Sequence, residues 1–160
     1  MGSAAEVFHR QHLPVFRWLR RMTGSQEQAE DLTQEVFLRV VRTITELPPD
    51  REAAWVFTIA RNLWLNRRRD RARRPVEITL AGAASAQVPA RSMEAIDLGA
   101  ALAALDETDR ETFLLRELGG LGYAEIAAVC ELSPDGVRSR IYRARCALRE
   151  SLSGAKEKRG

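Results

Sequence analysis

Apolar side chains in the first half of the chain recur at steps of three and four residues, which is the spacing of one face of an α-helix. The clearest stripe predicts an amphipathic helix that packs one side against a core, and it consists of Ala29, Leu32, Val36, Val40 and Ile44. Ser25 and Gln28 precede it with the spacing of a capping box, which would satisfy the first backbone N–H groups of the helix. On another face, acidic residues repeat every four positions, at Glu27, Asp31 and Glu35.

Two further helices are predicted on either side of this one. Residues 4–22 form the first, which we expect to be bent or split near Pro14 and closed by Gly24. Residues 51–73 form the other, and Pro75 would end it because a proline disfavours the helical conformation of the residue before it.

The alanine-rich stretch 75–91 contains two prolines and no helical apolar stripe, so it is predicted to be a flexible linker. Beyond it the pattern is helical again, over 92–105, from Asp106 or Thr108 to 118, over 123–131 and over 134–152. Ser133 would cap the last of these, with Pro134 in its first position. The predicted fold class is therefore all-α. Its parts are a small helical domain at 1–74, the linker, a second helical domain at 92–153 and a frayed tail at 154–160.

Charge is distributed unevenly along the 160 residues. The net charge is +3, yet residues 61–74 alone hold seven arginines against one aspartate, so the rest of the chain is net acidic. Such asymmetry favours a nucleic acid or a membrane surface as partner. No apolar run approaches the roughly 18 residues of a membrane span, and nothing resembles a secretory signal. We therefore expect a cytoplasmic protein without membrane insertion.

Residues 122–145 have the spacing of a helix-turn-helix. The side chains expected to form its interior are Ala124, Ile126, Ala127, Leu132, Val137 and Ile141. The outward positions of its second helix are Asp135, Arg138, Ser139, Tyr142, Arg143 and Arg145. The second helix of such a unit presents its N-terminal half to base edges in the major groove, while flanking groups contact phosphates. The pattern favours binding to duplex DNA over a merely solvated basic face.

Aromatic and basic side chains share one side of the predicted helix 51–73. This side contains Phe57, Arg61, Trp64, Arg68 and Arg71. Aromatic rings and guanidinium groups together offer stacking surfaces and phosphate contacts, which suits unpaired bases. In the alternative interpretation the aromatic residues belong to the core and only the arginines face solvent. Trp55 is expected in the core, and for Trp64 both positions stay open.

The sequence indicates neither an enzyme nor a cofactor site. His9 and His12 lie three residues apart but have no further ligand nearby, so no metal site is predicted. Cys130 and Cys146 are too few for a disulfide framework, and we interpret them as small core residues.

In this order, the two halves resemble the extracytoplasmic-function (ECF) group of the sigma-70 family, the initiation subunits of bacterial RNA polymerase. The first half carries the resemblance in "AEDLTQEVFLRVVR" and "WVFTIARNLWLNRRR". The second carries it in "LDETDRETFLLRELGGLGYAEIAAVCELSPDGVRSRIYRARCALRESL". The resemblance covers nearly the whole chain. It implies a protein that binds core RNA polymerase and directs promoter-specific initiation without chemistry of its own.

The resemblance also implies roles for particular residues. Asp31, Gln34 and Glu35 would dock on the clamp of the largest polymerase subunit, and the second domain would contact the flap of the second-largest subunit. The loop 43–55, together with Asn62, would capture a flipped base of the −10 element. The residues that would hold the melted −10 strand are Arg61, Asn62, Trp64, Arg67 and Arg68. Those that would read the −35 duplex are Arg138, Ser139, Tyr142 and Arg143.

One departure from the family pattern affects these expectations. The usual Gly-Thr at the start of the recognition helix is Asp135-Gly136 here, so the −35 element is expected to be read differently in detail. Relatives are often held by an anti-sigma protein, and such a partner is included in the expectation. Two rival interpretations stay open. A stand-alone helix-turn-helix regulator of duplex operators would leave the faces of the first domain unexplained, and an RNA- or single-strand-binding adaptor would leave the helix-turn-helix unused.

Overall fold

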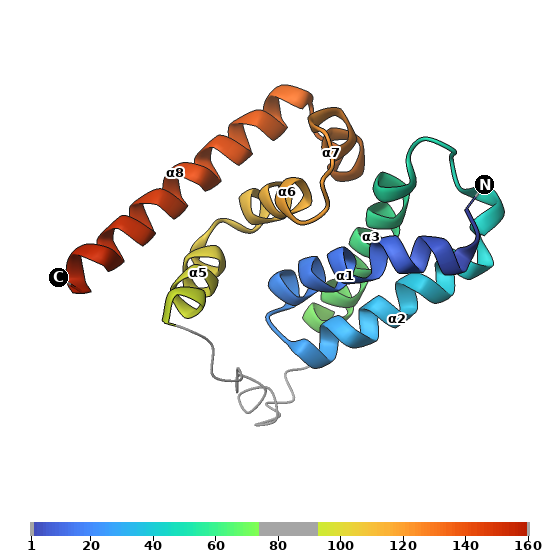
Figure 1. Ribbon diagram of the computed structural model, residues 1–160, viewed down its shortest axis with the longest axis horizontal. Coiled ribbons are helices and arrows are strands. Elements are labelled where there is room, and N and C mark those ends of the chain that lie inside the picture. Colours follow the sequence, from blue (N-terminus) through green and yellow to red (C-terminus); the bar gives the residue numbers. More distant parts are fainter. Residues whose placement is uncertain (1, 74–92, 160) are drawn as a thin grey trace. The chain divides into compact units, whose positions relative to one another are not determined.

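All regular structure in residues 2–73 and 93–159, the parts that the computed structural model describes, is helical, which confirms the predicted fold class (Figure 1). The helices fall into two compact units, one before residue 74 and one after residue 92. The predicted linker at 75–91 and the position of Ser92 lie outside the described residues.

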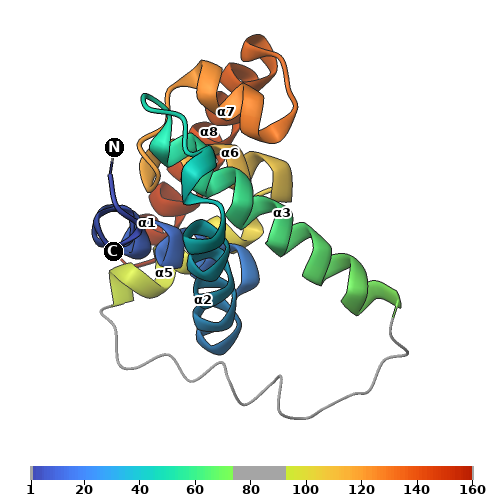
Figure 2. The same ribbon diagram turned by 90° about the vertical axis from the view of Figure 1, so that its right-hand side faces the viewer.

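Within residues 2–73, the first unit contains three α-helices and one 3₁₀ turn. They are α1 (Ala4–Thr23), α2 (Gln26–Arg42), η1 (Ile44–Glu46) and α3 (Glu52–Arg73). Helices α1 and α2 run antiparallel and side by side, and α3 packs against both. The last turns of α3 extend beyond the other two helices (Figure 2). The basic end of α3 is therefore presented to solvent, while its first half belongs to the core.

Helix α1 is closed at both ends by capping residues. The Ser3 hydroxyl accepts the N–H of Glu6, and the Glu6 carboxylate accepts the N–H of Ser3 at 2.9 Å. Gly24 ends the helix with a φ of 72° and donates its N–H to the Arg20 carbonyl. The helix runs continuously through Pro14 and does not split there. The loss of one backbone hydrogen bond is tolerated because buried side chains on both sides hold the helix against the core.

The predicted stripe of α2 faces the core as expected at four of its five positions. Ala29, Leu32, Val36 and Val40 are all buried. Ile44 is only half-buried, because α2 ends at Arg42 and Ile44 begins η1. The Ser25 hydroxyl accepts the N–H of Gln28 at 3.3 Å, so the predicted N-cap is present.

An aromatic cluster joins α1 to α3. Trp18 is fully buried, and the rings of Phe57 and Trp64 meet it edge-on, with centroids at 6.0 and 5.8 Å. Trp64 is only 5% exposed, so the structure decides between its two interpretations in favour of the core. Trp55, which was expected in the core, is half-buried.

The described part of the second unit, residues 93–159, contains four helices. They are α5 (Met93–Ala104), α6 (Glu107–Glu117), α7 (Tyr123–Cys130) and α8 (Pro134–Arg159). Helix α8 packs against the other three, and Ser133 caps it by accepting the N–H of Gly136 at 3.0 Å. The sequence predicted an end near residue 152, but α8 continues to Arg159, because one glycine at 154 costs only about 1 kcal/mol and does not stop a helix. None of the described helices is long and apolar enough to cross a bilayer.

The helix-turn-helix is formed by α7 and α8. Ile126, Ala127, Val137 and Ile141 are buried between the helices, as predicted. The turn contains Glu131 and Leu132: Glu131 is left-handed with a φ of 56°, and Leu132 is half-buried. The prediction for Ala124 was wrong, because it lies on the outer side of the first turn of α7 and is exposed.

Candidate nucleic-acid interface

The four residues predicted to read the −35 duplex are all exposed on α8. They are Arg138, Ser139, Tyr142 and Arg143. Tyr142 is 71% exposed, so its ring is available for an apolar contact with a base. The interior side of the same turns is occupied by Val137 and Ile141. The 3.6-residue period of the helix therefore separates a packing side from a side that can enter a groove.

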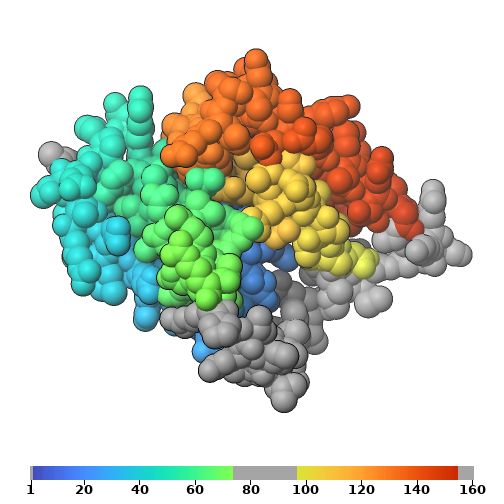
Figure 3. Space-filling view, turned by 180° about the vertical axis from the view of Figure 1, so that it is seen from behind, coloured from blue at the N-terminus to red at the C-terminus, as the bar shows by residue number. Residues whose placement is uncertain are grey.

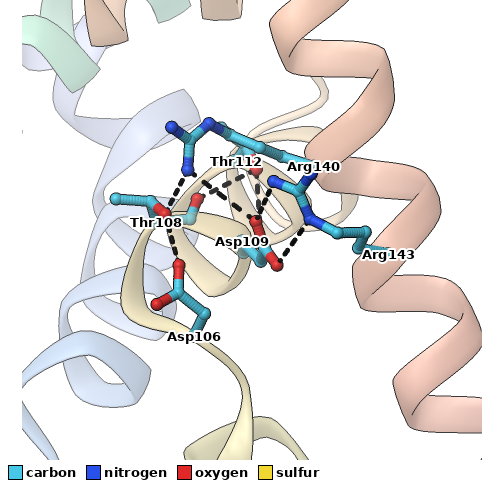
Figure 4. Close-up of polar contacts among 6 residues, drawn as sticks. All are labelled: Asp106, Thr108, Asp109, Thr112, Arg140 and Arg143. Atoms are coloured by element: carbon cyan, nitrogen blue, oxygen red, sulfur yellow. Dashed lines mark hydrogen bonds and ion pairs between the residues drawn. The ribbon is translucent and has the colours of Figure 1, made fainter.

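The two arginines of this side are held to very different degrees. The side chain of Arg138 is 64% exposed and contacts the exposed Asp135 at 3.4 Å. Arg143 donates from Nε and Nη2 to the two carboxylate oxygens of Asp109, at 3.3 and 3.1 Å (Figure 4). Hydrogen bonding to this carboxylate raises the pKa of Arg143 above its ordinary value. Arg138 also lies 5.8 Å from the centre of the Tyr123 ring, whereas Arg143 is held through a two-point contact with one carboxylate.

The start of α6 holds Asp109 in place. Asp106 caps this helix and accepts the backbone N–H groups of Thr108 and Asp109. The Thr108 hydroxyl donates to Asp106, and this hydrogen bond is the main cause that lowers the pKa of Asp106. Arg140 reaches the Thr108 hydroxyl and lies 3.8 Å from the Asp109 carboxylate (Figure 4). Capping, hydroxyl and guanidinium groups thus form one connected network between α6 and α8.

Asp109 is a residue that the sequence reasoning missed. The sequence indicates only that Arg140 and Arg143, three residues apart on one helix, lie close enough together to share one acidic partner. Which acidic residue supplies that partner depends on how α6 crosses α8.

The residues predicted to bind the melted strand lie along α3. Asn62 and Arg68 are exposed and Arg61 is half-buried. The guanidinium of Arg68 lies 5.6 Å from the centre of the Trp64 ring. Trp64 itself is buried, so its predicted stacking on a base is wrong for this conformation. The last turns of α3 stand on the outer surface (Figure 3).

Arg67 links two surfaces that the sequence analysis treated as separate. Its Nη2 lies 2.7 Å from Oε1 of Glu35 on α2, and the two side chains are 28% and 48% exposed. Arg67 was assigned to DNA and Glu35 to the polymerase. The structure therefore brings one residue of each set into an ion pair.

An apolar groove of about 700 Å³ lies between α1 and α2. It is lined by Phe8, His12, Phe16, Glu30, Thr33, Gln34, Phe37, Leu38 and Val41. Leu38 and Val41 are 57% and 59% exposed, and Phe8 is 45% exposed. Gln34, one of the predicted docking residues, belongs to this groove. The sequence already indicated an exposed apolar surface on α2, because the run "VFLRVV" has more apolar residues than the core-facing stripe of α2 contains.

The residues without an assigned role have local structural partners. The His12 ring stacks on Phe8, and its Nδ1 lies 2.9 Å from the Phe8 carbonyl oxygen. Cys130 is buried, with its sulfur 3.7 Å from a carboxylate oxygen of Glu111, and Cys146 is half-buried. Within the described ranges no group of three His, Cys, Asp or Glu residues could hold a metal ion.

The family models for Sigma-70 region 2 and Sigma-70 region 4 match residues 7–74 and 95–148. The ECF RNA polymerase sigma factor SigE of Mycolicibacterium smegmatis is 36% identical over 153 residues, which cover 90% of this chain and 60% of that relative. The ECF RNA polymerase sigma factor SigC of Mycobacterium tuberculosis is 37% identical over 127 residues, which cover 75% of this chain and 68% of SigC. The chain thus spans less than two thirds of the length of the first of these relatives.

Solved structures have the same fold. The sigma factor RpoE of Bartonella quintana, solved with the anti-sigma factor NepR, matches with a TM-score of 0.74 and 25% identity, over 91% of this chain and 94% of RpoE. CnrH, solved with the cytosolic domain of CnrY, matches with a TM-score of 0.68 and 28% identity, over 94% of this chain and 88% of CnrH. Two helical units in the order of regions 2 and 4, with relatives of the ECF group along most of the chain, establish that this protein belongs to the ECF group of the sigma-70 family.

Proposed function

We propose that this chain is a promoter-specificity subunit that binds core bacterial RNA polymerase and directs initiation at selected promoters. The observation that carries the proposal is the pairing of a region 2 match with a region 4 match on one chain, each with an exposed face of its own chemistry. The chain acts in the cytoplasm together with the polymerase. It makes and breaks no bond itself, since the polymerase supplies the chemistry.

Docking on the polymerase clamp uses the exposed side of α2. Asp31, Gln34 and Glu35 supply polar and acidic contacts there, and all three are exposed. The neighbouring groove, with Leu38 and Val41 at its edge, adds apolar surface that gains free energy when it is covered. A clamp segment with an apolar ridge and basic flanks fits this combination. The second unit contacts the flap.

Capture of the −10 element uses α3 and the loop before it. Extruding a base from a duplex costs a few kcal/mol. The exposed Asn62, together with the segment 43–55 that includes η1 and the first turn of α3, offsets this cost by binding the flipped base. Arg61, Arg67 and Arg68 neutralise phosphates of the opened strand. Trp64 has no part in this binding, because leaving the core would break its contact with Trp18.

Recognition of the −35 duplex uses the exposed side of α8. Arg138, Ser139, Tyr142 and Arg143 contact base edges and the backbone in the major groove. Asp135, whose side chain is 91% exposed at the start of the helix, repels phosphates. The register of the duplex on α8 therefore depends on the arginines further along the helix.

An anti-sigma factor is a further proposed partner. The support is that RpoE and CnrH, which share the fold, were each solved with a protein bound: the anti-sigma factor NepR with RpoE, and the cytosolic domain of CnrY with CnrH. The apolar groove between α1 and α2 is the surface best suited to hold such a protein in competition with the polymerase.

The proposal is tested by transcription from a pool of random-sequence duplex fragments with a bacterial core polymerase, with and without this chain. Sequencing the 5′ ends of the transcripts should reveal a shared upstream sequence that appears only when the chain is added. The stand-alone regulator instead predicts tight duplex binding by the chain alone and no new start sites. That pair of results would refute the proposal.

Two substitutions separate the surfaces. Asp31→Lys should weaken binding to core polymerase at least tenfold, which corresponds to about 1.4 kcal/mol, and Glu27→Lys on the same acidic face is the charge-matched control. Arg138→Ala should keep polymerase affinity but reduce initiation, because a lost arginine contact costs about 1–3 kcal/mol. Loss of polymerase binding in Arg138→Ala, or unchanged binding in Asp31→Lys, would contradict this division of labour.

A further inference from the structure

Asp109 is a carboxylate with little solvent contact that lies between two arginines of the recognition helix. Its side chain is 11% exposed, and it faces Arg143 at 3.1 Å and Arg140 at 3.8 Å. Both arginines come from successive turns of α8, whereas Asp109 belongs to the first turn of α6 (Figure 4). The network also contains the carboxylate of Asp106, so its two carboxylates balance the charges of its two guanidinium groups.

The bond to Asp109 uses only one edge of the Arg143 guanidinium. Nε and Nη2 donate to the carboxylate, and the side chain is nevertheless 58% exposed. A guanidinium has five N–H groups, and the Nη1 group does not take part in this fork. The end formed by Nη1 and the second hydrogen of Nη2 can donate to two acceptors at once. A guanine presents two such acceptors, O6 and N7, in the major groove.

We propose that Asp109 is a positioning residue for base reading: it holds Arg143 by its Nε edge, so that the other end of the guanidinium is aimed at a guanine of the −35 element. The inference rests on the proposed function. A long arginine side chain in solution samples many rotamers, and it can contact a phosphate or any neighbouring acceptor. One that is held by a carboxylate has already lost this freedom and points in one direction. Asp109 therefore contributes to discrimination between bases more than to total affinity.

The neighbouring arginine provides a contrast within the same helix. Arg138 contacts an aspartate that is itself 91% exposed, at 3.4 Å. Its guanidinium also lies 5.8 Å from the centre of the Tyr123 ring, but neither contact is a two-point hydrogen bond to a carboxylate that would orient the guanidinium plane. Arg143 is thus the arginine of this side that the surrounding structure prepares for a base.

The experiment measures base preference with the holoenzyme, formed from core polymerase and the full chain. The probe is a pool of promoter fragments selected by the wild-type holoenzyme and then randomised in the −35 element. Arg143→Ala should lose the preference for guanine at one position. Asp109→Asn should reduce the ratio of guanine to other bases at that same position by about fivefold or more, while binding to unselected duplex stays equal or rises because a negative charge is lost. The double variant should match Arg143→Ala.

Controls separate positioning from folding and charge. Glu150→Gln removes one exposed negative charge from α8, the helix of Arg143, and should leave the preference for guanine unchanged. If Asp109→Asn melts at a lower temperature, Asp109→Glu decides instead, because glutamate keeps the charge and the ion pair but shifts the carboxylate, and with it the Arg143 guanidinium, by the length of one methylene group. An unchanged guanine ratio in Asp109→Asn or in Asp109→Glu overturns the inference, as does an additional change when Asp109→Asn is added to Arg143→Ala. If the wild-type holoenzyme selects no sequence at all, the proposed function itself fails.

Discussion

Replacing Trp64 tests whether the aromatic residues of α3 serve the core or the DNA. Trp64 is 5% exposed and meets Trp18 edge-on at 5.8 Å. Truncation of a buried tryptophan to alanine costs about 3–5 kcal/mol, and an edge-on aromatic pair supplies about 0.5–1.5 kcal/mol of such a loss. Trp64→Ala should therefore remove a large part of the stability of the first unit, since whole domains have only about 5–15 kcal/mol.

The assay can follow the first unit within the full chain. All three tryptophans, Trp18, Trp55 and Trp64, lie in that unit, so tryptophan fluorescence reports its unfolding and not that of the second unit. For a unit of this size, a loss of 1 kcal/mol lowers the melting temperature by about 4–8 °C. Trp64→Ala should lower it by well over 10 °C on this scale. Trp64→Phe, which keeps one ring in the cluster, should lose about 1–2 kcal/mol.

A matched control distinguishes burial from a contact on the surface. Arg68→Ala removes a guanidinium that lies 5.6 Å from the same ring but is exposed, and such a cation–π contact is worth about 0.5–1 kcal/mol. If Trp64→Ala melts no lower than Arg68→Ala, and only its binding to single-stranded DNA is impaired, the core interpretation is refuted.

Two further predictions concern stability, one for an ion pair of the first unit and one for a glycine in each unit. Glu52→Gln breaks the ion pair in which Arg10 donates 2.6 and 2.9 Å hydrogen bonds to Glu52, and should destabilise the protein at pH 7 by no more than about 1 kcal/mol because solvent screens the pair. Hydrogen bonding to Arg10 lowers the pKa of Glu52, so this stabilisation is present above the unfolded-state pKa and is lost as the pH falls through the folded-state value. Melting curves of both proteins should therefore converge in acid, and a constant difference would contradict the assignment. Gly24→Ala should destabilise the protein by about 1 kcal/mol because Gly24 has a positive φ, whereas Gly154→Ala within α8 should stabilise it by a similar amount. Neither new methyl group meets an atom within 4 Å, so only backbone conformation should matter. Melting curves followed by circular dichroism measure both changes, and a change of the same sign in both variants would refute the conformational argument.

Local chemistry in the sequence was sufficient for the helices and their ends. The α2 stripe, the Ser25 and Ser133 caps and the Gly24 terminus follow from the spacing of apolar residues and from residues that satisfy terminal backbone groups. Such features depend on neighbours within one or two turns. The exposed acidic side of α2 was predictable for the same reason.

The sequence by itself determined an all-helical chain, a helix-turn-helix with an outward basic side, and motifs specific enough to indicate the family. Only the tertiary structure decided what each arginine or tryptophan faces. Trp64 and Arg68 belong to one stripe in the sequence, yet one is buried and the other exposed. The contacts of Arg67 with Glu35 and of Arg143 with Asp109 span 32 and 34 residues. Periodicity places a side chain on a side of its helix, but its partner depends on how two helices cross, and that is set by packing of the whole core.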